Sequence, residues 1–178
     1  DSAVTAKILL KANLQIKCIF IDTGLMREGE PQEALRLLEK NGIKTELISA
    51  SQEFFSALSN IVDPREKRLV FKKVYFQIIE KYLKDNNLTF LAQGSQSKID
   101  VLKRNYHNVS NNEYINSNIN KIEPLIGLSK TEIRQMARVF DFTPELAERI
   151  PFPGPGLLIR FGGSYTSEKL GIIRSATE

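Results

Sequence analysis

Several residue types are scarce in this sequence. Its 178 residues include one cysteine, one histidine and no tryptophan. The single cysteine, Cys18, excludes an internal disulfide and predicts a reducing, cytoplasmic environment. With one histidine, no paired-carboxylate motif and no thiol-based motif, the sequence offers few candidates for general acid–base or covalent catalysis.

Long apolar runs are absent too. No stretch approaches the roughly 20 apolar residues that span a bilayer, so we expect no association with a membrane. The first residues, "DSAVTAKILLKAN", lack the flanks of a signal peptide. They also lack a methionine, so we expect the natural amino terminus to lie upstream.

The charge is mildly positive. The formal net charge is +4 and the isoelectric point is about 9.1. The basic residues are spread along the chain rather than packed into one tract, which favours a solvated surface over a nucleic-acid patch. A polyanionic small molecule is an equally suitable ligand for this charge.

Apolar patterns predict helices and short strands in alternation. Helices are predicted over 1–13, 30–42, 51–60, 63–85 and 129–140. Strands are predicted over 16–22, 44–49 and 88–94, the first covered on both faces and the third buried. This order is typical of an α/β fold in which helices cover both faces of a parallel sheet.

Three of these helices begin with recognisable capping residues. Ser51 is a candidate N-cap, and Asp63 is followed by Pro64 at the first helical position. Ser129 and Glu132 have the spacing of a capping box. The segment "DPREKR" at 63–68 is interpreted equally well as a capped helix start or as a functional motif.

Ligands of parallel α/β sheets bind beyond the carboxyl ends of the strands. Those ends are predicted at 22–24, 49–51 and 93–95, and all three carry small or polar residues. Asp22 and its neighbouring backbone are suited to a ribose or base. Asp1 and Ser2 either cap the first helix or end a phosphate-binding loop, because a helix N-terminus attracts anions.

Two segments break the alternation. Residues 105–120 hold seven asparagines and predict a long loop, either a functional lid or a disordered segment. Residues 151–156, "PFPGPG", hold three prolines and two glycines and predict a stiff corner. The apolar "LLIRF" that follows predicts a strand that opens another domain. We therefore expect a nucleotide domain at 1–150 and a second, incomplete domain at 151–178.

Taken in order, the motifs resemble a known family. "DSAVTA", "IFIDTGLMR", "DPREKR", "FLAQG", "YHNV", "IEPL", "KTEIR" and "PFPGPGLLIR" are similar to GMP synthetase in its ATP-pyrophosphatase portion. The resemblance implies the PP-loop fold, which is adenine-nucleotide alpha-hydrolase-like, and a ligase that uses ATP and Mg2+. It implies that XMP becomes adenylated and that ammonia then releases GMP. It also implies a separate glutamine amidotransferase subunit as partner and a homodimer built by a carboxyl-terminal domain.

The resemblance assigns roles to particular residues. It implies that Asp1 lies near Mg2+ and that Ser2 holds pyrophosphate. The other implied site residues are Asp22, Thr23, Gly24 and Gly94 for ATP, His107 for catalysis, and Asp100, Asn108, Pro153 and Gly154 for the substrate.

The sequence departs from the family pattern in the lid. Tyr106 stands where the family has a histidine, Ser110 where it has a glycine, and the lysine expected to reach the phosphates has no counterpart. Two alternatives therefore stay open: an enzyme that adenylates another acceptor, such as a tRNA base, and a relative that binds ATP without catalysis.

Overall fold

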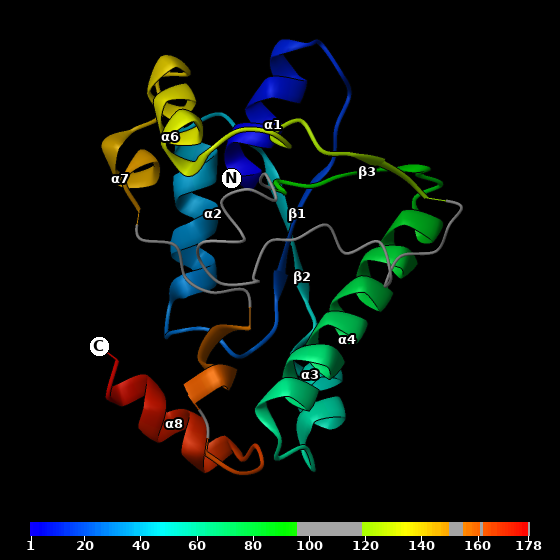
Figure 1. Cartoon of the computed structure of the whole chain (residues 1–178), viewed down its shortest axis with the longest axis vertical. Helices are drawn as coiled ribbons and strands as arrows, with labels where there is room; N and C mark the ends of the chain where they lie inside the picture. Colours follow the sequence, from blue (N-terminus) through cyan, green and yellow to red (C-terminus); the bar gives the residue numbers. More distant parts are fainter. Residues whose placement is uncertain (96–118, 150–154, 161, 178) are drawn as a thin grey trace.

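The computed structural model describes residues 1–95, 119–149, 155–160 and 162–177 (Figure 1). Its helices are α1 (Ser2–Lys11), α2 (Glu30–Lys40), α3 (Ser51–Leu58), α4 (Pro64–Asp85), α6 (Lys130–Val139), α7 (Pro144–Ala147) and α8 (Ser167–Ser175), and the 3-10 helix η2 spans Gly156–Arg160. Its strands are β1 (Cys18–Asp22), β2 (Thr45–Ser49), β3 (Phe90–Ala92) and β4 (Asn120–Ile122). Each helix and strand predicted within residues 1–149 is present, and β4 lies where the end of the asparagine-rich loop was expected. Within the described ranges, no helix has both the length and the apolar character needed to cross a membrane.

Local capping explains two of the helix starts. The Asp63 carboxylate accepts hydrogen bonds from the backbone N–H groups of Arg65 and Glu66, both at 2.9 Å. Ser129 and Glu132 form the predicted capping box at the start of α6. The prediction for Ser51 is wrong, because Ala50 occupies the N-cap of α3 and no side chain caps this helix.

Two apolar clusters lie on opposite faces of the β1–β2 pair. Side chains of α1, α6 and the end of α2 form one cluster, and side chains of α3, α4, η2 and α8 form the other. The strand β1 contributes to both clusters, since Cys18 packs against the first while Ile19 and Ile21 pack in the second. This arrangement confirms an α/β fold with helices on both faces.

The strand pairs are parallel, as predicted, but they do not form one sheet among the described residues. β1 pairs with β2 from Cys18↔Thr45 to Asp22↔Ser49, and β3 pairs with β4 over three residues on each strand. A cavity of about 750 Å³ separates β1 from β3 and is also lined by α1 and α4. The expectation of a buried strand is wrong for β3, because Phe90 at its start is 59% exposed.

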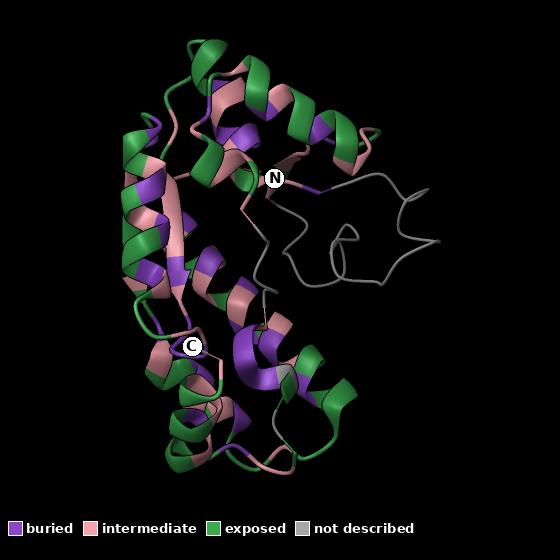
Figure 2. Ribbon diagram, turned by 90° about the vertical axis from the view of Figure 1, so that its left-hand side faces the viewer, coloured by how far each residue is buried: buried purple, intermediate pink, exposed green. Residues whose placement is uncertain are grey.

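The predicted strand at "LLIRF" is wrong over its described residues. Residues 156–160 form η2 instead, and Leu157 and Leu158 are fully buried in the cluster that contains Phe54 (Figure 2). Gly156 has a φ of +62°, which turns the chain so that both leucines enter this core. The described residues after 155 thus pack on elements within residues 1–95, while the division at residue 150 stays a prediction.

Candidate nucleotide site

The first part of the site lies where α1 begins. Asp1 occupies the N-cap position, but its side chain makes no capping hydrogen bond. Its carboxylate instead forms an ion pair with the ammonium group of Lys130, at the start of α6. The capping interpretation is therefore wrong for the Asp1 side chain, which faces a cation and is only 14% exposed.

Gly94 also lies against the start of α1. A Cβ atom at Gly94 would lie 2.9 Å from the Asp1 carbonyl carbon and 2.9 Å from the Ser2 nitrogen. Real Cβ atoms do not approach backbone so closely, so glycine is needed for the chain after β3 to pass against α1. The structure thus brings Gly94 against Asp1 and Ser2, which lie more than 90 residues before it in the sequence.

Lys130 was missed by the sequence analysis. Burial lowers the pKa of its ammonium group, and the nearby charge of Arg134 lowers it further. A lysine in the first turn of a helix opposes the helix dipole, and this was the one signal that could have marked the residue. Its contact with Asp1 spans 129 positions of sequence, which no local spacing indicates.

This group of residues is chemically suited to phosphate. The first backbone N–H groups of α1 have no partner within the helix, and a helix N-terminus favours anions. Lys130 adds a positive charge beside them. The residues that the structure describes contain no cluster of three or more metal-ligating side chains. One carboxylate fits Mg2+ that is held mainly by phosphates and water, which is how this ion commonly binds in nucleotide sites.

The second part of the site is the turn after β1. The Asp22 carboxylate accepts a hydrogen bond from the Gly24 N–H at 2.9 Å, and the Thr23 hydroxyl accepts one from the Leu25 N–H at 3.3 Å. Thr23 is fully buried, so its side chain shapes the turn rather than presenting a surface to a ligand. A Cβ atom at Gly24 would lie 2.6 Å from the Phe55 ring, so this position also requires glycine.

Two of the three predicted strand ends, those of β1 and β2, lie next to each other. The Ala50 N–H donates to the Asp22 carbonyl at 2.9 Å, so the ends of β1 and β2 meet. The third end does not join them, because β3 belongs to a separate strand pair whose end contacts α1 instead. Figure 1 shows the N-terminus beside the upper part of the β1–β2 pair, whereas α3, which follows β2 directly, lies at the lower end.

Several predicted site residues cannot be placed. Asp100, His107, Asn108, Pro153 and Gly154 lie outside the described residues. Their assigned roles stay predictions.

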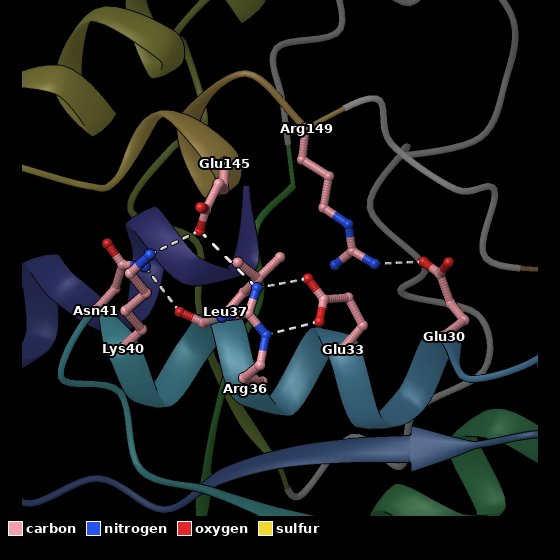
Figure 3. Close-up of polar contacts among 8 residues, drawn as sticks. All are labelled: Glu30, Glu33, Arg36, Leu37, Lys40, Asn41, Glu145 and Arg149. Atoms are coloured by element: carbon pink, nitrogen blue, oxygen red, sulfur yellow. Dashed lines mark hydrogen bonds and ion pairs between the residues drawn. The ribbon is translucent and has the colours of Figure 1, made fainter.

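Polar contacts along α2 fix the chain just before the proline–glycine segment (Figure 3). Arg149 pairs with Glu30, in the first turn of α2, at 2.5 Å. Glu145 on α7 pairs with Lys40 at 2.9 Å, near the other end of α2. These ion pairs hold α7 and Arg149 against the helix that follows the β1 turn.

Comparison with known proteins decides the family. A family model described as "Thiamine biosynthesis protein (ThiI)" matches residues 1–149. The chain belongs to the ThiI family. The ThiI match covers Asp1, Asp22, Gly94 and Lys130.

Individual relatives of this ThiI-family chain carry a more specific name. One subunit of the glutamine-hydrolyzing GMP synthase of Methanopyrus kandleri is 35% identical over 99% of the chain, and the corresponding protein of Archaeoglobus fulgidus is 38% identical over 100%. These matches confirm the resemblance to GMP synthetase. The chain spans 58% and 60% of the lengths of these two relatives.

A solved structure supports the fold. NMN synthetase from Francisella tularensis superposes with a TM-score of 0.63 at 14% identity, covering 99% of this chain and 80% of that one. At this identity the likeness establishes the α/β fold alone.

Proposed function

We propose that the protein is the ATP-pyrophosphatase subunit of a GMP synthase. In this proposal it uses ATP to adenylate XMP, and ammonia from a separate glutamine amidotransferase subunit then displaces AMP to give GMP. The observation that carries the proposal is the identity of 35–38% with GMP synthase subunits of two organisms over at least 99% of the chain. A homodimer belongs to the same proposal.

The chain's own residues would act by positioning and charge neutralisation. The first turn of α1, with Ser2, would receive the pyrophosphate part of ATP, and Lys130 would balance its charge. Asp1 would hold Mg2+, which would supply positive charge to neutralise the phosphates. The turn at Asp22 would receive the adenosine. Because this chemistry needs little proton transfer by side chains, the scarcity of histidine and thiol groups is compatible with it.

A second candidate is adenylation of another acceptor, such as a tRNA base. The matching family model is described by thiamine biosynthesis rather than purine synthesis, and this observation favours a broader range of acceptors. A third candidate, ATP binding without catalysis, follows from the altered lid.

One assay separates the three candidates. Pyrophosphate release is measured with ATP and Mg2+, in turn alone, with XMP, with XMP and ammonium, and with RNA. We expect release that depends on XMP and formation of GMP that depends on ammonium. Release only with RNA, or ATP binding without release under any condition, would contradict the proposal.

The Asp22→Ala variant tests the adenosine assignment. We expect it to weaken ATP binding about tenfold, equivalent to ~1.4 kcal/mol, while the far-ultraviolet circular dichroism stays unchanged. Asp85→Ala is the matched control, because Asp85 lies at the far end of α4 in an exposed ion pair with Lys81. Equal ATP affinity in the Asp22→Ala and Asp85→Ala variants would overturn the assignment.

A further inference from the structure

The turn after β1 is held by residues from a distant part of the sequence. Three consecutive carbonyl oxygens of this turn accept hydrogen bonds from residues 157 and 174. Arg174 donates through Nη2 to the Gly24 carbonyl at 3.0 Å and through Nε to the Met26 carbonyl at 3.0 Å. The Leu157 N–H donates to the Leu25 carbonyl between them at 2.6 Å.

The packing around these bonds is close. A Cβ atom at Gly156 would lie 2.2 Å from the Leu25 carbonyl oxygen, so η2 lies directly against the turn. Leu25 and Leu157 are both fully buried. Tyr165, between η2 and α8, stacks on Phe55 with ring centroids 4.7 Å apart. The Phe55 ring in turn lies directly against Gly24 in the turn.

Arginine is chemically suited to this position. The turn lies outside the β1–β2 ladder, so its carbonyl groups need partners from elsewhere in the fold. A guanidinium group carries donors in a fixed fork and so can bridge the carbonyls of residues 24 and 26 at once, whereas a lysine presents all its donors on one atom. Glu28, 3.5 Å from Nη1 of Arg174, helps to orient the fork.

We propose that Arg174 is a positioning residue for the nucleotide site: it holds the turn after β1 in the conformation that receives the nucleoside, and its hydrogen bonds to this turn raise the affinity of the site. The identity of the ligand rests on the proposed function. The ordering of the turn by Arg174 does not rest on it. Figure 1 shows η2 and α8 at the lower end of the β1–β2 pair, on the side where this turn lies.

Hydrogen exchange tests the ordering of the turn without any ligand. In Arg174→Ala we expect the amides of residues 22–28 to exchange at least tenfold faster than in the unmodified chain, with Arg174→Lys between the two. Lys169→Ala is the matched control, because Lys169 also lies on α8 and donates to backbone carbonyls, at Gly162 and Ser164. Exchange at residues 22–28 that is equal in Arg174→Ala and Lys169→Ala would overturn the proposal.

ATP titration tests the consequence for binding. We expect ATP affinity to fall about tenfold in Arg174→Ala, to fall less in Arg174→Lys, and to stay unchanged in Lys169→Ala. Faster exchange in Arg174→Ala with unchanged ATP affinity would contradict the positioning role. If the unmodified chain binds no ATP, the proposed function fails, and the exchange experiment still decides whether Arg174 orders the turn.

A milder variant covers the case in which Arg174→Ala does not fold. Glu28→Gln removes the orienting charge and leaves both hydrogen bonds from Arg174 to the turn possible. We expect a two- to threefold rise in exchange at residues 22–28 and a similar loss of ATP affinity. Unchanged values in both Glu28→Gln and Arg174→Lys would overturn the proposal.

Discussion

β1 and β3 both run parallel to a partner strand and both end at residues predicted to contact a nucleotide, but they are held in different ways. β1 pairs over five residues and leads into a turn whose Thr23 and Leu25 are fully buried. β3 pairs over three residues, and Phe90 at its start is largely exposed. The part of the candidate site at the turn after β1 is thus held by buried side chains. The part at the start of α1 is held by the close approach of two backbone segments at Gly94.

A cavity lies between the two strands. Its lining includes Cys18 and Ile19 of β1 and residues 90–92 of β3. Each of these strands has a partner on one edge only within the described residues. β1 packs against helices on both faces, whereas β3 places Leu91 at the edge of the cluster that contains Phe54 and otherwise contacts β4 and the start of α1.

The largest effect on stability is expected when a buried side chain of the turn after β1 is truncated. Leu25→Ala should lower the free energy of unfolding by about 2–5 kcal/mol, because it leaves a cavity among fully buried side chains. Phe90→Ala, a larger truncation on β3, should cost less than about 1 kcal/mol because the ring is already exposed. Urea unfolding measures both values, and similar losses would refute the contrast between the strands.

An intermediate effect is expected at the backbone contact that follows β3. Gly94→Ala should destabilise the protein by about 1–3 kcal/mol, because the added methyl group meets the backbone of Asp1 and Ser2. Gly162→Ala is the control, since no atom lies within 4 Å of its added Cβ. A Gly94→Ala variant as stable as Gly162→Ala in thermal unfolding would show that β3 does not need this close approach.

The smallest effect on stability is expected at Tyr82, in the wall of the cavity between β1 and β3. Tyr82 of α4 lines it and donates to the Glu46 carboxylate on β2 at 2.6 Å. Burial and this carboxylate raise the pKa of Tyr82 to about 12. Since the folded pKa lies above the unfolded value, the contribution to stability is complete below about pH 10 and is lost as the pH rises through 12.

Glu46→Gln should therefore lower the pKa of Tyr82 toward its ordinary value without moving the other tyrosines. An ultraviolet difference titration of the variant against the unmodified chain isolates this group. Superimposable titration curves would show that Glu46 does not influence Tyr82 in solution.

Local signals predicted most of the elements. The caps at Asp63 and Ser129 depend on neighbours within three residues, so sequence spacing was sufficient to find them. The short strands were also found, because their apolar runs stand between helical patterns. The segment "LLIRF" was misassigned because an apolar run suits a strand and a buried 3-10 turn equally well, and only its packing on Leu25 distinguishes them.

The candidate site was only partly predictable for a related reason. The motifs identified Asp1, Asp22 and Gly94, since each follows or begins a recognisable element. Lys130 and Arg174 act through contacts with residues 129 and 150 positions away, for which the sequence carries no periodic or local signal. The sequence also could not predict that the described strands form two separate pairs, because the alternation of helices and strands does not specify which strands pair.

The bonds from Leu157 and Arg174 also bear on the order in which the molecule is assembled. The turn at residues 24–26 leaves the ribosome well before residues 157 and 174, so its carbonyl groups meet their last partner only after residue 174 has been synthesised. Contacts this distant in sequence close a longer loop, so they cost more conformational entropy than local contacts do. The nascent chain can therefore form α1, β1 and α2 before the turn acquires its final shape, so full affinity for a ligand would arrive only once α8 has emerged.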